Sequence, residues 1–303
     1  MMRAKSLKVA SSQYPIGQPK TLAEWEKKIA LWVKHGAATG AELLVFPEYA
    51  AIEQAACFGP EVYEDLQATL TKVAELKESR VQLHLELAKK HNVHILVGSG
   101  PVKKTDGRFV NAAQLVTPKG AIGEQEKLVM TPFEHNWGVT AGGPVRVFST
   151  SLGTIGIAIC YDSEFPLIAR AMAEAGAEVL LVPSCTERTS GYHRVRTGSM
   201  ARALENTIAA VQSPTVGDAP WSPAVDFNAG AAGIYVPSEH DVSDTGVLAE
   251  GTLNAAEWVS AEIDLARLAR VRETGEMHNF GDWLKQPGGG TTAKVDVEVV
   301  NLA

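Results

Sequence analysis

Short apolar runs alternate with longer amphipathic stretches along most of the chain. Residues 7–13 predict a first strand, and residues 21–35 predict a helix with Thr21 as its N-cap, closed by Gly36 and Gly40. The same alternation then recurs. We expect helices in the stretch that ends near residue 91 and at 167–175 and 194–206, and strands at 41–46, 93–99, 154–160, 178–183, 207–212 and 231–236.

A predicted hairpin interrupts this alternation. The runs 109–116 and 121–127 flank the turn Thr117-Pro118-Lys119-Gly120, which is typical of an antiparallel connection. Helices between buried strands indicate sheets whose faces are covered by helices, and the hairpin indicates that the sheets are mixed. The sequence therefore predicts an α/β fold. No Pro/Gly/Ser-rich linker divides its middle, so we expect a single domain over residues 1–286.

The C-terminal residues 287–303 differ from this predicted domain. A Gly-rich joint at 288–290 precedes Val295, Val297 and Val299, which alternate with charged residues as in a strand. An isolated strand is not stable without a surface to pair with. We therefore expect an arm that lies across a partner subunit. A loose chain end is the alternative.

Composition and charge narrow the class of protein. Of the 303 residues, 45% are hydrophobic and 21% are charged, as in an ordinary globular protein. A formal net charge of -7 without a long Lys/Arg block argues against nucleic acid or a membrane as the main partner. Cys57, Cys160 and Cys185 show neither CxxC nor Cys/His metal spacing, which favours free thiols in a cytoplasmic protein.

Three predicted strands end in polar residues that a packed core does not favour. Glu48 follows the strand at 41–46, Lys127 ends the second hairpin strand, and Cys160 ends the strand at 154–160. Strand ends of layered α/β proteins open onto the crevice where ligands bind. A carboxylate, an ammonium group and a thiol that meet there predict a nucleophilic site.

The three groups have complementary chemistry. Cys160 needs a base before it becomes a good nucleophile, and Glu48 can accept its proton and return it to a leaving amine. Lys127 and the backbone N–H of Tyr161 can stabilise negative charge that grows on a carbonyl oxygen or a nitrile nitrogen. Taken singly, each side chain also has a structural explanation: a small core cysteine, a helix-capping glutamate and a solvated lysine.

The segments around these residues resemble the nitrilase, or carbon–nitrogen hydrolase, superfamily. The matching segments are FPEYA at 46–50, EKLVMTPFE at 126–134, ICYDSEFP at 159–166 and RALEN at 202–206. They occur in the order of that family. The resemblance implies a four-layer αββα sandwich and a catalytic triad of Glu48, Lys127 and Cys160. The sequence after Cys160 is similar to a poorly characterised, amidase-like branch. The resemblance also implies a homodimer or a higher even-numbered oligomer with the C-terminal arm at the subunit interface.

The resemblance extends to the surroundings of the triad. Related enzymes carry a second active-site glutamate on the loop after the lysine, and Glu134 matches it; a surface acid is the alternative. We also expect the helix that begins near Pro166 to direct its positive end toward Cys160 and thereby to favour the thiolate.

The residues expected to bind substrate depart from the better-known branches of the family. Glu164 stands where an arginine is common, and Ser-Cys-Thr-Glu-Arg at 184–188 replaces a common Ser-Ala-Trp. The first change disfavours a substrate carboxylate, and acids at these positions favour a neutral or cationic substrate. Pairing of Glu164 with Arg170 or another surface cation is the alternative. The residues predicted to line the substrate pocket are Trp137, Glu164, Cys185, Thr186, Glu187 and His193.

Together these features favour a hydrolase of a non-peptide C–N bond, and most of all an amidase that acts on a small linear amide through a cysteine thioester. A nitrilase, an acyltransferase that uses an amine in place of water, and a non-catalytic binding or assembly protein are the alternatives. Nothing in the sequence requires a metal or an organic cofactor.

Overall fold

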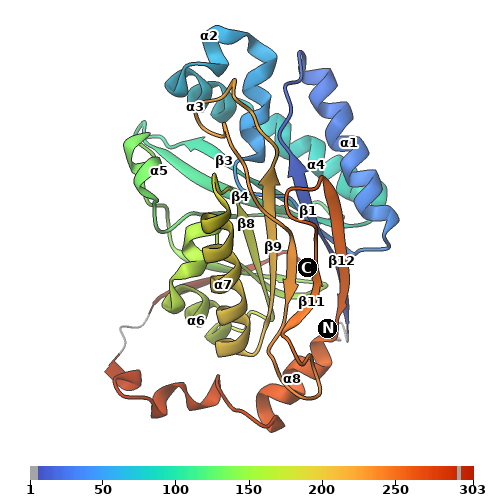
Figure 1. Ribbon diagram of the computed structural model, residues 1–303, viewed down its shortest axis with the longest axis vertical. Helices are drawn as coiled ribbons and strands as arrows, with labels where there is room; N and C mark the ends of the chain where they lie inside the picture. Colours follow the sequence, from blue (N-terminus) through green and yellow to red (C-terminus); the bar gives the residue numbers. More distant parts are fainter. Residues whose placement is uncertain (1–5, 292–294) are drawn as a thin grey trace.

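The computed structural model describes residues 6–291 and 295–303. The 13 strands within these residues form one hydrogen-bonded system with two halves (Figure 1). The first half contains β1 (Leu7–Pro15), β2 (Leu43–Val45), β3 (His94–Lys103), β4 (Phe109–Val116), β5 (Ile122–Glu126) and β12 (Glu257–Ile263). Its strand order is β12-β1-β2-β3-β4-β5. The β1–β2 and β2–β3 pairs are parallel and the others antiparallel, so this half is mixed.

The second half has the order β13-β6-β7-β8-β9-β10-β11 and is also mixed. Its strands are β6 (Val145–Thr150), β7 (Gly153–Ile157), β8 (Val179–Ser184), β9 (Ala209–Val216), β10 (Gly233–Tyr235), β11 (Val247–Glu250) and β13 (Val297–Asn301). The two halves join where the end of β1 pairs with the end of β9, through Tyr14–Thr215 and Pro15–Val216.

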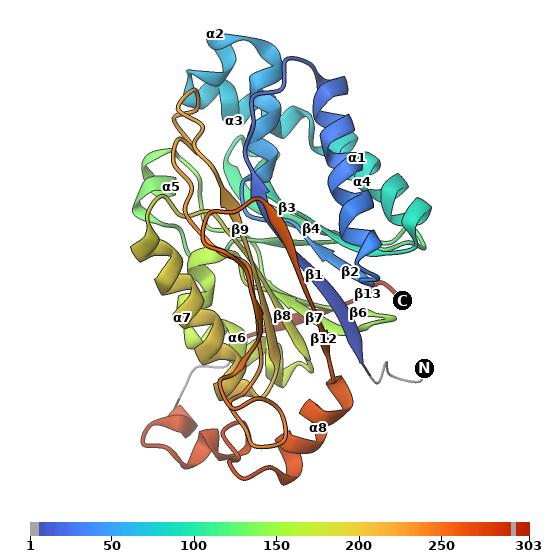
Figure 2. The same ribbon diagram turned by 45° about the vertical axis from the view of Figure 1, so that its right-hand side comes forward.

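Helices cover the outer faces of both halves. The longer ones are α1 (Leu22–Ala38), α3 (Leu66–Glu75), α4 (Lys77–His91), α6 (Pro166–Glu174), α7 (Thr189–Asn206) and α8 (Leu265–Thr274). The others are the 3-10 helices η1 (Ala50–Phe58), η2 (Cys160–Glu164), η3 (Gly281–Lys285) and η4 (Gly289–Thr291) and the short α-helices α2 (Pro60–Tyr63) and α5 (Pro132–Asn136). In Figure 2, α1 and α4 lie outside the first sheet, whereas α6 and α7 lie outside the second. The predicted αββα sandwich is confirmed.

The alternation of side chains along each strand explains these layers. Along β2, Leu43 and Val45 belong to the core that the two sheets share, whereas Leu44 belongs to the cluster under α1 and α4. Trp25 and Ile29 of α1 pack into that second cluster. Because successive side chains of a strand point to opposite faces, a fully apolar strand is buried on both. None of the described helices is both long enough and apolar enough to span a membrane.

Several predicted boundaries are wrong. The helix predicted at 194–206 begins earlier, at Thr189, and the strand predicted at 207–212 is β9 at Ala209–Val216. The helix α1 continues through Gly36 to Ala38. The ring of Trp258 packs so closely against Gly36 that a Cβ there would lie 2.9 Å from it. Gly36 therefore serves close packing and does not end the helix. The strand predicted at 154–160 ends at Ile157, and Cys160 begins η2. The candidate nucleophile thus lies on a turn just beyond the strand.

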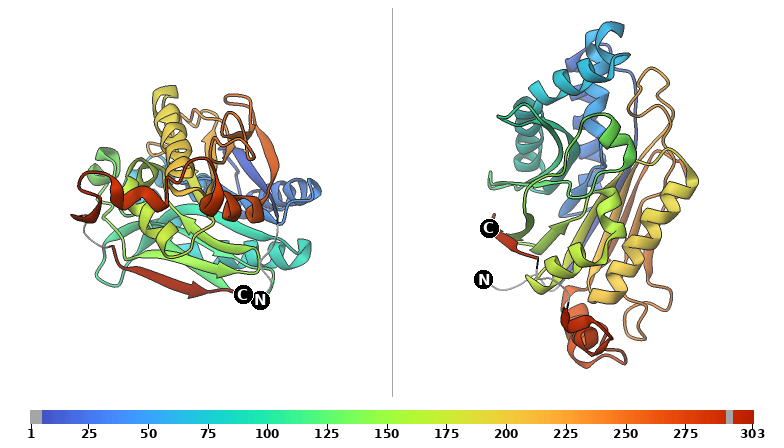
Figure 3. Two further views of the ribbon diagram at one scale, coloured as in Figure 1. Left: turned by 90° about the horizontal axis from the view of Figure 1, so that it is seen from below. Right: turned by 90° about the vertical axis from the view of Figure 1, so that its left-hand side faces the viewer.

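Residues 295–303 add an edge strand to the second sheet. The strand β13 pairs in parallel with β6 of the same chain, from Val297–Val145 to Asn301–Ser149, and Figure 3 shows it at the edge of the molecule. A strand in this segment is therefore confirmed. Its place at a subunit interface stays a prediction, and residues 292–294 of the predicted arm lie outside the described residues.

The strand β3 is irregular at Gly98, where it contacts Pro47, the residue before Glu48. The register of β3 against β4 shifts between Leu96 and Ser99, and Gly98 there has a φ of +85°. A Cβ on Gly98 would lie 2.2 Å from the carbonyl oxygen of Pro47, which accepts a hydrogen bond from Ser99 N at 3.1 Å. The positive φ and the close backbone both require glycine at this position.

We expect Gly98→Ala to lower the free energy of unfolding by about 1–3 kcal/mol more than Gly107→Ala, because the added methyl group meets backbone. Gly107 also has a positive φ, +88°, but a Cβ there meets nothing within 4 Å, so its variant isolates the backbone strain. Urea denaturation of both variants measures the difference. Equal losses would contradict the role assigned to the contact with Pro47.

Candidate active site

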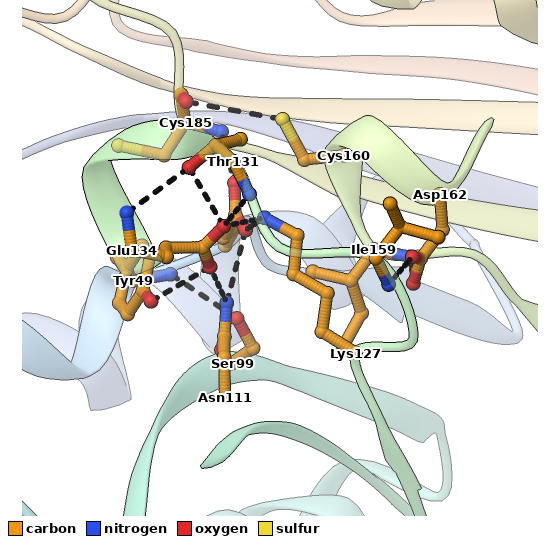
Figure 4. Close-up of polar contacts among 12 residues, drawn as sticks. Tyr49, Ser99, Asn111, Lys127, Thr131, Glu134, Ile159, Cys160, Asp162 and Cys185 are labelled. Carbon is orange, nitrogen blue, oxygen red and sulfur yellow. Dashed lines mark hydrogen bonds and ion pairs between the residues drawn. The ribbon is translucent and has the colours of Figure 1, made fainter. Parts of the chain in front are cut away.

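Glu48, Lys127 and Cys160 follow the ends of β2, β5 and β7 and meet in one buried cluster. The Lys127 Nζ lies 2.8 Å from Glu48 Oε1 and 2.6 Å from Glu134 Oε2, and at most 2% of each of these side chains is exposed. The peptide of Cys185 links this group to Cys160. Its N–H donates to Glu48 Oε2 at 2.9 Å, and its carbonyl oxygen lies 3.9 Å from the Cys160 Sγ (Figure 4).

The ammonium group of Lys127 stays charged although it is buried. Burial opposes its charge, but the carboxylates of Glu48 and Glu134 outweigh that effect and raise the pKa of Lys127 well above its ordinary value of 10.5. Burial also opposes the ionisation of Glu134, yet the ion pair with Lys127 lowers the pKa of Glu134 below its ordinary 4.5. A fixed cation therefore lies at the centre of the cluster.

The Cys160 thiol is neutral in the resting structure. Burial raises the pKa of Cys160 well above its ordinary value of 9.0, and the charge of Glu48 raises it further. The thiolate is therefore not the resting state of Cys160, and an effect of the helix near Pro166 on the thiol stays a prediction. Burial also raises the pKa of Glu48 above 4.5, which makes it a stronger base. The cluster thus pairs a neutral thiol with a nearby base.

Glu134 lies inside the cluster and not on the surface. It belongs to the first turn of α5, where it forms a capping box with Thr131. Its Oε2 accepts hydrogen bonds from Lys127 and from Thr131 N, and its Oε1 accepts from the Tyr49 hydroxyl at 2.8 Å and from Asn111 Nδ2 at 3.1 Å. These donors leave the carboxylate little freedom to move.

A strained turn presents Cys160. Its φ is +49°, a left-handed conformation that is costly for a residue other than glycine. Ser163 Oγ donates to the Cys160 carbonyl oxygen at 2.6 Å, and Arg202 of α7 donates to the Ser163 carbonyl oxygen at 2.9 Å. Tyr161 is the second residue of η2, and the first N–H groups of a helix have no partner within it. This N–H is the predicted oxyanion donor.

Asp162 ties the Lys127 loop to the Cys160 turn. Its carboxylate accepts hydrogen bonds from the N–H groups of residues 128–129, the shortest at 2.8 Å, and from Ile159 N–H at 3.2 Å. Residue 128 directly follows Lys127, and Ile159 directly precedes Cys160. Burial raises the pKa of Asp162 to about 7, against the effect of these backbone donors. One carboxylate therefore fixes the relative position of the two candidate catalytic residues.

Three of the residues predicted to bind substrate lie beside the cluster. Cys185 Sγ lies 3.3 Å from Asn228 Oδ1, and Thr186 Oγ1 donates to the carbonyl oxygen of the residue after Asn228 at 2.7 Å. These contacts hold the loop before β10 against the end of β8. The half-buried Trp137 packs its ring edge-on against Tyr49, with 5.7 Å between ring centroids.

Glu164, Glu187 and His193 lie apart from the cluster. Glu164 pairs with Arg194 at 3.4 Å, and both residues line an open groove of about 530 Å³ along α7 together with His193. No triad residue lines this groove. Glu187 is exposed on the loop before α7. The alternative stated for Glu164 is therefore the arrangement found. Glu164 pairs with a surface cation, and that cation is Arg194 and not Arg170.

Sequence reasoning missed four residues that support the cluster, namely Tyr49, Asn111, Asp162 and Arg202. Three of them lie inside FPEYA, ICYDSEFP and RALEN, so their position next to the candidate residues was a usable signal. Asn111 left a weaker signal, a polar residue within the buried strand FVNAAQLV. Its contacts could not be read from that pattern.

Comparison with known protein families gives a match over most of the chain. The family model described as carbon-nitrogen hydrolase matches residues 8–273. YhcX of Bacillus subtilis (strain 168), a probable hydrolase, is 35% identical over 277 residues, which are 91% of this chain and 53% of that protein. The chain thus spans about half the length of this relative.

Solved structures share the fold. Nit3 of Saccharomyces cerevisiae, a member of branch 10 of the nitrilase superfamily, has a TM-score of 0.71 at 19% identity, over 89% of this chain and 94% of that one. A Glu-to-Gln mutant of the amidase from Nesterenkonia sp. AN1 has a TM-score of 0.67 at 20% identity, over 88% and 94%. In that mutant the acetamide moiety of fluoroacetamide is covalently added at the active-site cysteine.

We expect Asp162→Ala to lower the free energy of unfolding by about 1–3 kcal/mol and to reduce turnover, because it leaves buried N–H groups without an acceptor and frees both loops. The control is Asp106→Ala, which removes an exposed carboxylate from the turn at Arg108. Urea denaturation and steady-state kinetics of both variants check this. Equal stability and turnover in the two variants would contradict the role of Asp162 in holding the Lys127 loop against the Cys160 turn.

Proposed function

Because the chain belongs to the carbon–nitrogen hydrolase family, we propose that it is an amidase that cleaves a small linear amide through a thioester on Cys160. The observation that carries this proposal is the buried ion cluster in which Lys127 contacts both Glu48 and Glu134, with Cys160 alongside. Glu48, Lys127 and Cys160 are the proposed catalytic residues, and Glu134 keeps Lys127 charged and in place.

In the first half of the reaction, Glu48 accepts the thiol proton while the Cys160 sulfur attacks the amide carbonyl carbon. Two of the three N–H donors of Lys127 serve the carboxylates, and the third, together with Tyr161 N–H, stabilises the resulting oxyanion. Glu48 then returns the proton to the amide nitrogen. The C–N bond breaks, ammonia leaves, and the acyl group stays on sulfur as a thioester.

In the second half, water attacks the thioester carbonyl while Glu48 removes a proton from that water. The C–S bond breaks, the carboxylic acid leaves, and Cys160 recovers its proton from Glu48. The neutral thiol suits this cycle, because the proton that Glu48 needs for the leaving nitrogen comes from Cys160 itself. The amidase whose cysteine carries an acetamide moiety supports a cysteine-centred reaction on small amides.

The energetics of the cluster argue against a protein that only binds. Three charged side chains with at most 2% exposure each are costly to bury, and such groups seldom stabilise a fold better than apolar residues would. A binding or assembly protein would gain little from this arrangement. A catalyst gains a fixed cation and a base beside a nucleophile.

An ammonia-release screen of the purified chain against small amides, nitriles and carbamoyl compounds tests the proposal. We expect release from amides and its loss in Cys160→Ala with an unchanged melting temperature. The half-buried free thiol Cys57 supplies the control, and Cys57→Ala should keep its activity. Full activity of Cys160→Ala would overturn the nucleophile assignment, and release from nitriles alone would assign a nitrilase.

The pH dependence of kcat/KM follows from the state of Glu48, which must be ionised to accept the thiol proton. Burial raises the pKa of Glu48 above 4.5, so Glu48 becomes protonated at a higher pH than an ordinary glutamate does. We expect the acid limb of the kcat/KM profile to have its midpoint above pH 4.5. A midpoint at or below 4.5 would contradict Glu48 as a buried base.

A further inference from the structure

The Asn111 amide contacts both carboxylates of the cluster. Its Nδ2 donates to Glu48 Oε1 at 3.0 Å and to Glu134 Oε1 at 3.1 Å. The backbone carbonyl oxygen of Asn111 accepts a hydrogen bond from the backbone N–H of Lys127 at 2.7 Å. The side chain is fully buried in β4 and is drawn beside Lys127 and Glu134 in Figure 4. No substrate or proton step in the proposed reaction uses it.

We propose that Asn111 is a positioning residue that holds Glu48 and Glu134 on Lys127 and so keeps Glu48 ionised and aligned for proton transfer with Cys160. This inference rests on the proposed role of Glu48 as the base. It adds a residue that acts through the carboxylates and does not touch the reacting atoms.

The Asn111 amide can donate hydrogen bonds to both carboxylates in one orientation only. With Nδ2 toward the carboxylates, one amino group serves two acceptors; with the amide turned over, its oxygen would face two other oxygens. In the orientation observed, Asn111 Oδ1 has no hydrogen-bond donor among the described residues. Burying an unpaired amide oxygen costs stability, so the residue does not optimise the fold.

The contacts of Glu48 explain what Asn111 contributes. Its Oε1 accepts from Lys127 Nζ and Asn111 Nδ2, and its Oε2 accepts from Cys185 N–H, so the carboxylate cannot rotate without breaking a bond. The titratable groups that face Glu48 are Lys127 after β5, Glu134 on α5, Cys160 on η2, Cys185 after β8, and Tyr49 beside it. Lys127 is the single cation in this set, and Asn111 adds a neutral donor that favours the ionised carboxylate.

Two variants of Asn111 separate charge from shape. Asn111→Asp keeps the shape and places an oxygen against the two carboxylates, whereas Asn111→Leu keeps a similar volume and removes the donor. The matched control is Gln114→Ala, because Gln114 is another buried amide of β4, with its Nε2 bonded to Glu124 and the Ala112 carbonyl. Circular dichroism and thermal melting establish which variants are folded.

The readout is the rate at which iodoacetamide alkylates Cys160, measured from pH 5 to pH 9 by peptide mass spectrometry. The Cys160 sulfur displaces iodide from carbon after its proton leaves, so the rate of this alkylation reports ionisation at Glu48 and Cys160 through a step separate from amide hydrolysis. The same variants are assayed for kcat and KM on an amide that the wild type hydrolyses.

For Asn111→Asp we expect the alkylation profile to move to higher pH by about one unit or more, which is about tenfold slower alkylation at a pH on the acid limb. Asn111→Leu should move it in the same direction by less, and Gln114→Ala should leave it in place. In the assay, kcat should fall in both Asn111 variants while KM changes little.

Wild-type profiles in both Asn111 variants, or an equal shift in Gln114→Ala, would overturn the inference. If Asn111→Asp does not fold, the comparison of Asn111→Leu with Gln114→Ala decides it. A wild type that hydrolyses no amide would defeat the proposed function, whereas the alkylation profiles would still decide the role of Asn111.

Discussion

The ion cluster of Lys127 with Glu48 and Glu134 is the constraint on which the rest of the site depends. One cation faces two carboxylates where at most 2% of each side chain is exposed, so the cluster carries an excess negative charge without bulk water to screen it. Neutral donors reduce that cost: the Tyr49 hydroxyl, the Asn111 amide, and the N–H groups of residues 131 and 185 all point at the carboxylates. Their placement is therefore a condition for the charged state of the cluster.

The sandwich delivers these groups because strand ends meet at one edge of facing sheets. Glu48 and Lys127 come from the first sheet and Cys160 from the second, so the site lies where the two halves of the molecule meet. Asp162 joins the backbone after Lys127 to the backbone before Cys160 across that boundary. The close contact between β3 and the backbone of Pro47 fixes the position of Glu48, the next residue. Each catalytic candidate is thus held by backbone contacts and not by its side chain alone.

The sequence predicted most of the fold and the identity of the charged residues. Apolar periodicity located most of the strands and the hairpin, because burial on one or both faces leaves a direct trace in the pattern. It missed β6, β11 and β12. Glu48, Lys127 and Cys160 were recognisable because polar residues stand at three strand ends and because the segments around them resemble the carbon–nitrogen hydrolase superfamily. The strand before Cys160 was predicted too long, since apolar residues 158–159 continue into the turn.

What the pattern could not supply were contacts between residues distant in sequence and the electrostatics of burial. The Asn111 amide reaches Glu48 across 63 positions, and only the tertiary fold brings them together. The Cys160 thiol is neutral because of burial and a neighbouring carboxylate, and the sequence alone shows neither of these effects. Glu164 and His193 follow the nucleophile in sequence but face an outer groove, because the direction of a side chain depends on packing.

The most direct test of this account is the intact mass of the protein after rapid acid quenching during turnover of an amide. The account predicts a mass increase equal to the acyl group, located on Cys160, which forms and disappears in step with product. Turnover without any adduct, or with an adduct on Cys185 in place of Cys160, would contradict it.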